Sequence, residues 1–255
     1  MPRLFHHWRH PRRCYVVCAI ARSGSNLLTD GLCSTRRAGR PNQFFWPPSE
    51  DNFRKRHGLS VDIAFADYVR AIIQRSATSN EVFGFKLMAW YVNDFLERLR
   101  QTRAFGQADD SDLLLLRNAF PQLRFIHIKR RNKLRQAISK ARALQSGLYK
   151  IQPHKTESAP AAFDRALINR CLKEAEERET TWNAFFHRNC LEPFHVEYEE
   201  LCQDYEGVIR GVFDFLHIVL PRRATLVPLI TKRQSDELSA EWERRYLASA
   251  APHAL

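Results

Sequence analysis

Residues 15–28 read YVVCAIARSGSNLL, and this stretch decides the fold. Residues 15–20 form a continuous apolar run with β-branched members, which is typical of a strand buried on both faces. A short polar turn follows over residues 21–26, and Leu27 and Leu28 indicate the start of a helix. The stretch therefore predicts a strand–loop–helix unit.

The same alternation continues along the chain. Three further apolar runs predict strands at 82–85, 123–128 and 194–198. Apolar residues at helical spacing predict helices between them, chiefly at 61–75, 91–103, 111–120, 133–144 and 161–188. Short strands separated by helices indicate a mostly parallel sheet flanked by helices on both faces, which is a three-layer α/β sandwich.

Two proline-containing segments interrupt this pattern. Residues 39–58 hold three prolines and four aromatic residues, and we predict a loop without regular structure there. Residues 150–160 hold Pro153 and Pro160 and are predicted as a second loop.

The composition is that of a globular protein with an excess of positive charge. The 255 residues are 44% hydrophobic, and 40 lysines and arginines against 28 acidic residues give a net charge of +12. This balance favours anionic partners such as nucleic acid, an anionic membrane or a phosphorylated small molecule. The length allows one large domain, which we assign to 14–250, after a basic N-terminal arm at 1–13.

Targeting and metal signals are not found in the sequence. No apolar run approaches the ~18 residues that span a bilayer. Residues 1–13 lack the apolar stretch of a secretory signal, so we expect a cytoplasmic protein. The six cysteines form no CxxC pair and have no zinc-ligand spacing, so we expect reduced thiols and no metal site.

Polar residues follow the first predicted strand at its carboxyl end, where ligands bind in parallel sheets. Gly24 permits a tight turn whose amides can form an anion-binding nest. Ser23, Ser25 and Asn26 add side-chain donors, and Arg22 adds positive charge. The loop is not a Walker A motif because it has no Gly-Lys pair. The alternative is an ordinary turn whose helix is capped by Ser23 or Ser25.

Basic residues also follow the other predicted strands. Lys86 comes at the end of the second strand, where it can neutralise a developing negative charge. Arg130 and Arg131 come at the end of the third, and Ser139 lies two helical turns further on. A late basic stretch at 232–235 can close over an anion. The alternative for each is a solvated surface group.

Taken together, these motifs resemble one family, the bacterial carbohydrate sulfotransferases of the trehalose 2-sulfotransferase type. The motifs occur in the family's order between about residues 15 and 246. They are ARSGSNLL at 21–28, AGRPNQFF at 38–45, FGFKLM at 83–88, RRNKLRQAIS at 130–139, and KRQSD at 232–236 followed by Trp242, Arg245 and Tyr246.

The resemblance implies a P-loop-like α/β fold that binds 3′-phosphoadenosine 5′-phosphosulfate (PAPS) and needs no metal. Residues 22–26 would hold the 5′-phosphosulfate. Ser139 with either Arg130 or Arg131 would hold the 3′-phosphate, and the adjacent arginines leave that choice open. The late block, Arg233 and Gln234, is expected to lie against the cofactor. A homodimer is compatible with the resemblance.

One position departs from the family pattern. The family's motif after the first helix resembles Gly-x-Pro-x-Glu-Phe-Phe, and its Glu is the proposed general base, whereas this chain has Gln43. A neutral amide cannot take a proton from the acceptor hydroxyl, although it can orient that hydroxyl. Other candidate bases in the same region are Glu50, Asp51 and His57.

The predicted reaction is in-line transfer of a sulfuryl group from PAPS to a hydroxyl. Arg22, Lys86 and the loop amides would stabilise negative charge, and Gln43 would position the acceptor. The acceptor is expected to be a small carbohydrate, with a trehalose-type sugar as one candidate, or a glycolipid. Phe44, Phe45 and Trp46 can stack on a sugar ring or belong to the core.

Three other classes of function remain open at this stage. A PAPS-binding homologue with impaired or no catalysis follows from Gln43. A nucleoside-phosphate kinase would need the Walker lysine that the chain lacks. A protein that binds nucleic acid or another polyanion would fit the charge, but the basic residues are spread along the chain, so we expect no nucleic-acid partner.

Overall fold

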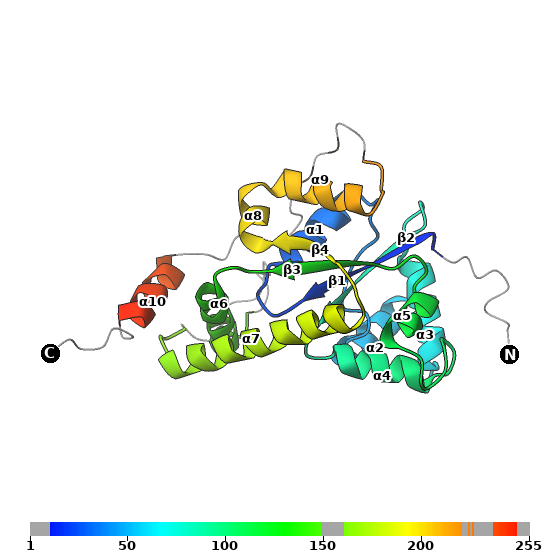
Figure 1. Cartoon of the computed structure of the whole chain (residues 1–255), viewed down its shortest axis with the longest axis horizontal. Coiled ribbons are helices and arrows are strands. Elements are labelled where there is room, and N and C mark those ends of the chain that lie inside the picture. Colours follow the sequence, from blue (N-terminus) through cyan, green and yellow to red (C-terminus); the bar gives the residue numbers. More distant parts are fainter. Residues whose placement is uncertain (1–10, 149–160, 221–223, 225, 227–236, 249–255) are drawn as a thin grey trace.

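The centre of the fold is a four-stranded parallel sheet with the order β2-β1-β3-β4 (Figure 1). We describe a computed structural model over residues 11–148, 161–220, 224, 226 and 237–248. All three strand pairs are parallel, which confirms the α/β class. The strands are β1 (Arg13–Ala19), β2 (Val82–Met88), β3 (Arg124–Lys129) and β4 (Phe194–Glu197).

Helices cover both faces of this sheet, which gives the three layers expected from the sequence. In Figure 1, α1, α8 and α9 lie on one side of the sheet and α6 and α7 lie on the other. The helices are α1 (Ser25–Ser34), α2 (Pro47–Arg56), α3 (Phe65–Ser76), α4 (Val92–Gln101), α5 (Asp112–Ala119), α6 (Lys133–Ser146), α7 (Arg165–Arg188), α8 (Tyr198–Gln203), α9 (Tyr205–Phe215) and α10 (Glu237–Ala248).

Strands β1 and β2 are buried along almost their whole length. Every residue of β2 is buried, and in β1 only Arg13 is exposed. A cluster of buried aromatic rings packs beside β2 and includes Phe45, Phe83, Phe85, Phe95 and Phe120. This burial explains why both strands were visible in the sequence as unbroken apolar runs.

The predicted loop at 39–58 is wrong in its second half, because α2 occupies Pro47–Arg56. Pro47 and Pro48 stand in the first turn of α2, where no intrahelical bond needs their missing N–H groups. The two prolines therefore begin a helix here instead of preventing one. Two other boundaries also differ: β1 begins at Arg13, the last residue assigned to the basic arm, and α3 begins at Phe65 rather than at 61.

The start of α5 agrees with the helix predicted at 111–120. Oγ of Ser111 accepts a hydrogen bond from the backbone N–H of Leu114 (3.2 Å), which confirms the predicted start of α5. Among the described residues, none of the helices is both long and apolar enough to cross a membrane.

His127 makes the stability of the sheet depend on pH. It lies in β3, is 1% exposed, and its Nδ1 has no hydrogen-bond partner among the described residues. Burial, followed by the charges of Lys129 and His195, lowers the pKa of His127 to about 3. The folded protein therefore holds this imidazole neutral at pH values where the unfolded chain protonates it.

We predict that the free energy of unfolding falls as the pH drops from 6.5 towards 3. The unfolded state binds the extra proton in this window, so the contribution of His127 falls by up to about 1.4 kcal/mol per pH unit. Urea unfolding across this range should show a shallower decline for His127→Leu than for the natural chain. The matched control is His187→Leu, since His187 is exposed on α7. Equal slopes for all three proteins would contradict the assignment.

Candidate active site

The turn between β1 and α1 lies at the carboxyl end of β1. Gly24 precedes the helix with φ 92°, and no side chain caps α1. The alternative of a helix capped by Ser23 or Ser25 is therefore wrong. Ser23 is fully buried, and its Oγ donates to the carbonyl of Ile20 (2.9 Å), which fixes the turn. The first N–H groups of α1 have no partner within the helix and can bind an anion.

Tyr198 closes one side of this turn. A Cβ atom on Gly24 would lie 2.3 Å from Cδ2 of Tyr198, so no larger residue fits between loop and ring. The guanidinium carbon of Arg130 lies 4.5 Å from the centroid of the same ring. The ring thus contacts both the loop after β1 and the arginine after β3.

Lys86 lies inside β2 and not at its end, which corrects the sequence prediction. The strand continues to Met88, and Lys86 pairs with Val17 of β1. The side chain is buried rather than exposed (3% exposure), and its Nζ donates to Oδ1 of Asn26 in the first turn of α1 (2.8 Å). The ammonium group therefore reaches the β1–α1 turn from a neighbouring strand.

Helix α6 packs against the same turn through two polar side chains. Nε of Arg22 donates to Oγ of Ser139 (2.9 Å). Nε2 of Gln136 donates to the carbonyl of Ala21 (2.7 Å). Residues 136 and 139 share one face of the helix. The spacing in the sequence suggested that Ser139 shares a pocket with the arginines after β3, whereas the hydrogen bond that Ser139 makes in the structure is to Arg22.

The two adjacent arginines after β3 point in different directions. Arg130 is 8% exposed, and its Nη1 lies 3.5 Å from the carbonyl of Arg22. The Nε atom of Arg130 is buried and has no hydrogen-bond partner among the described residues. Arg131 is exposed, and its Nε pairs with Glu197 at 2.7 Å. Arg130 is therefore the arginine that faces the β1–α1 turn.

Glu199 occupies the amino end of α6. Its carboxylate accepts hydrogen bonds from the backbone N–H groups of Arg131 (3.0 Å) and Asn132 (3.1 Å). Burial raises the pKa of Glu199, but these two bonds and the nearby Arg130 outweigh burial and lower the pKa overall. A carboxylate with a lowered pKa thus already binds the N–H groups at this helix end.

Gln43 lies beside Lys86 because the backbone on its amino side is tied to β2. The N–H of Lys86 donates to the carbonyl of Asn42 (2.9 Å). Oδ1 of Asn42 accepts the N–H of Gln43 (2.8 Å). Gln43 is half-buried, and its Oε1 is buried with no hydrogen-bond partner among the described residues.

The aromatic residues after Gln43 belong mainly to the core. Phe44 and Phe45 are 3% and 0% exposed and pack on Phe83 and Phe95, so they cannot stack on a sugar. Trp46 is half-buried and directly precedes α2. Of the three aromatic residues, Trp46 is the one with surface to offer a ligand.

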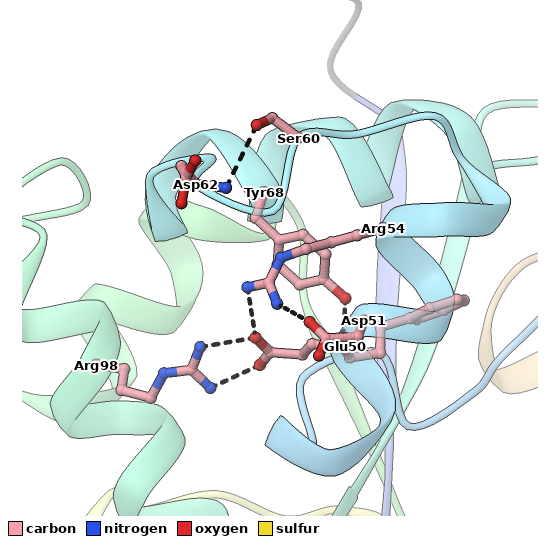
Figure 2. Close-up of polar contacts among 8 residues, drawn as sticks. Glu50, Asp51, Arg54, Ser60, Asp62, Tyr68 and Arg98 are labelled. Atoms are coloured by element: carbon pink, nitrogen blue, oxygen red, sulfur yellow. Dashed lines mark hydrogen bonds and ion pairs between the residues drawn. The ribbon is translucent and has the colours of Figure 1, made fainter.

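The other candidate bases are engaged elsewhere or lie further along α2. Figure 2 shows Glu50 held by the guanidinium groups of Arg98 and Arg54, with Oε1 2.6 Å from Arg98 Nη1. Asp51 is exposed and pairs with Arg54. His57 follows the last turn of α2, and burial, with the charges of nearby arginines, lowers its pKa. None of these contacts brings a carboxylate or imidazole to Lys86.

Two predicted site residues, Arg233 and Gln234, lie outside the described residues. The described part of the chain contains no cluster of three or more His, Cys, Asp or Glu side chains that could hold a metal ion.

The sequence of residues 14–249 matches the family described as Stf0 sulphotransferase. The chain belongs to this family. The match covers both the β1–α1 turn and the region after β3, and it confirms the resemblance identified from the sequence motifs. The chain is thus a sulfotransferase.

Two curated relatives are trehalose 2-sulfotransferases. The Mycolicibacterium smegmatis protein is 30% identical, and the match covers 94% of this chain and 96% of the relative. The Mycobacterium tuberculosis protein is 25% identical, with 93% and 96% covered. Among solved structures, the sulfotransferase domain from the Synechococcus PCC 7002 olefin synthase has 14% identity and a TM-score of 0.46, over 96% of this chain and 100% of that domain.

The sequence pattern places Tyr198 in the fourth predicted strand and so misses its contacts with the β1–α1 turn and Arg130. A signal was available, because Tyr198 directly follows β4, just as the other candidates follow β1 and β3. Its position against Gly24 depends on the β4–α8 junction, which the apolar pattern alone does not locate.

We predict that Gly24→Ala destabilises this sulfotransferase more than Gly58→Ala does. Both glycines have positive φ (92° and 58°), which costs alanine about 1–2 kcal/mol. A Cβ at Gly24 also overlaps Tyr198, whereas a Cβ at Gly58 meets nothing within 4 Å. Urea unfolding of the two variants measures the difference. Adding Tyr198→Ala should restore part of the free energy of unfolding that Gly24→Ala removes. If the double variant is no more stable than expected from the two single variants, the proposed overlap with the ring is contradicted.

Proposed function

We propose that this sulfotransferase uses PAPS as its donor and transfers the sulfuryl group to a hydroxyl of a carbohydrate or glycolipid. The observation that supports this most is the meeting of three cationic side chains at one anion-binding turn. Arg22 belongs to the turn, Lys86 reaches it from β2, and Arg130 reaches it from the end of β3. A donor with two separate anionic ends suits this arrangement.

The residues present fit such a donor chemically. The amides of residues 24–26 are proposed to hold the 5′-phosphosulfate beside the side chains of Asn26 and Lys86. Ser23, which the sequence motif included, is excluded because its N–H and its hydroxyl both donate to the carbonyl of Ile20.

Arg130 offers a buried Nε that has no hydrogen-bond partner among the described residues. Ser139 offers a hydroxyl from α6, where it already contacts Arg22. We assign the 3′-phosphate to Arg130 and Ser139. Arg233 and Gln234 are proposed to lie against the nucleotide.

The proposed chemistry is an in-line displacement at sulfur. The acceptor oxygen forms a new bond to sulfur as the bond from sulfur to the bridging phosphate oxygen breaks, which releases 3′,5′-bisphosphoadenosine. Charge on the leaving phosphate and on the transferring group is stabilised by the turn amides, Arg22 and Lys86. If the transition state is loose, as in phosphoryl transfer, positioning and electrostatics supply most of the rate.

The acceptor hydroxyl is proposed to meet Gln43. The amide Oε1 can accept a hydrogen bond from the hydroxyl and orient it towards sulfur, but it cannot retain the proton. Trp46 provides an aromatic surface for a sugar ring at the start of α2. Because both curated relatives are named for trehalose, that disaccharide is the first acceptor to test.

The amide at position 43 also supports a second candidate function. Without a general base, the chain can be a PAPS-binding homologue whose turnover is reduced or lost. General-base catalysis typically contributes ~10²–10⁴-fold, so its loss slows a reaction that other groups still promote.

We predict that 3′,5′-bisphosphoadenosine binds more tightly than ADP or ATP and without Mg²⁺. Arg130→Ala and Ser139→Ala should weaken this binding, by about 10–100-fold for the arginine, because a charge-assisted hydrogen bond is lost. Calorimetric titration measures each affinity. Arg131→Ala is the matched comparison, since Arg131 pairs with Glu197. If Arg131→Ala alone weakens binding, the assignment of the two arginines is reversed. Mg²⁺-dependent ATP binding would favour a kinase.

We predict that Gln43→Glu raises kcat with trehalose by up to about 10²-fold, because a carboxylate can take the acceptor proton. The affinity for 3′,5′-bisphosphoadenosine should stay unchanged. Asn42→Asp is the matched control, since it adds the same charge one residue away and keeps the acceptor for the Gln43 N–H. An equal effect of both variants would indicate a change in charge and not a restored base.

A further inference from the structure

A buried ion-pair cluster links three helices behind the segment that carries Gln43 (Figure 2). The Glu50 side chain is 3% exposed. Its two oxygens accept hydrogen bonds from both Nη atoms of Arg98 (2.6 and 3.0 Å) and one from Arg54 (3.0 Å). Glu50 and Arg54 are in α2 and Arg98 is in α4, so the carboxylate fixes α2 against α4.

The same cluster contacts α3 through aromatic rings. The guanidinium of Arg98 lies 3.8 Å from the ring centroid of Phe65, and that of Arg54 lies 4.9 Å from the ring centroid of Tyr68. Tyr68 is fully buried, and its hydroxyl donates to the backbone carbonyl of Phe44 (2.6 Å). The chain of contacts therefore runs from Glu50 through Arg54 and Tyr68 to the residue after Gln43.

The backbone around Gln43 is consequently held at two points. On its amino side the carbonyl of Asn42 accepts the N–H of Lys86, and on its carboxyl side the carbonyl of Phe44 accepts the hydroxyl of Tyr68. Trp46, which is two residues further on, directly precedes α2, whose orientation Glu50 fixes. Two residues that we assign to acceptor binding thus depend on one cluster.

We propose that Glu50, Arg54, Arg98 and Tyr68 form a clamp that positions Gln43 and Trp46 for the acceptor, and that Glu50 is a positioning residue. The functional half of this proposal rests on the proposed function. Glu50 is not available as a base, because two guanidinium groups engage both of its carboxylate oxygens. Small displacements of a reacting group carry large losses in rate, so a clamp behind the acceptor segment affects turnover without contacting the acceptor.

The first test uses hydrogen exchange and needs no acceptor. Tyr68→Phe deletes the hydroxyl that holds Phe44 and keeps the ring under Arg54. We expect amide exchange over residues 43–46, and at the Lys86 amide, to become about fivefold faster or more, as befits the loss of one hydrogen bond. Glu50→Gln should accelerate the same amides further. If Glu50→Gln does not fold, Tyr68→Phe alone decides.

The matched control is Asp67→Asn in α3. Asp67 forms a part-exposed ion pair with Arg70. Among the described residues, it makes no hydrogen bond or ion pair with the cluster or with residues 42–46. Its exchange pattern over 43–46 should match that of the natural chain. Unchanged exchange over 43–46 in both clamp variants overturns the clamp, whether or not the chain transfers a sulfuryl group.

The second test separates positioning from plain stabilisation. With trehalose and PAPS, Tyr68→Phe should lower kcat/KM for trehalose about fivefold or more, while calorimetry gives an unchanged affinity for 3′,5′-bisphosphoadenosine. Faster exchange with unchanged kcat/KM overturns the positioning role. Failure of the natural chain to prefer the 3′-phosphate nucleotide refutes the proposed function instead, and the exchange test still decides the clamp.

Discussion

The site depends on the central position of β1, which pairs in parallel with β2 on one side and with β3 on the other. Neighbouring parallel strands have their carboxyl ends at the same edge of the sheet. The residues that follow β1 and β3 therefore lie close together although they are far apart in the sequence. The interior of β1 is fully covered and tolerates only apolar side chains. Most polar side chains of the candidate site therefore come from residues that follow the strands. Lys86 differs, because it lies within β2 and its side chain extends to Asn26.

Four arginines of the chain differ in what their guanidinium groups contact. Arg98, Arg54 and Arg131 pair with carboxylates, which compensates their charge. Arg130 instead contacts an aromatic ring and a backbone carbonyl, and it makes no ion pair among the described residues. The charge of Arg130 acts on the carboxylate of Glu199 and helps to lower its pKa. The hydrogen bonds of that carboxylate are made to the backbone N–H groups of Arg131 and Asn132 and not to the guanidinium of Arg130.

How far the sequence predicts this structure depends on whether a feature is local. The buried strands and most helices were predictable because their apolar periodicity follows directly from burial. Helix α2 was not, because Pro47 and Pro48 were interpreted as breakers although they suit a first helical turn. The end of β2 at Met88, and so the true setting of Lys86, depends on pairing with β1. The choice between Arg130 and Arg131 depends on Tyr198 and Glu197, which are distant in sequence.

At position 43 the chemistry of the side chain and the position of the backbone are set by different contacts. A carboxylate can both accept a hydrogen bond and take up a proton, whereas the oxygen of the Gln43 amide can only accept a hydrogen bond. Orientation depends on the backbone, and here the carbonyl groups on both sides of Gln43 are bound by Lys86 and Tyr68. Those bonds do not involve the side chain at 43. The backbone on both sides of position 43 is therefore held by bonds that do not depend on which side chain stands there.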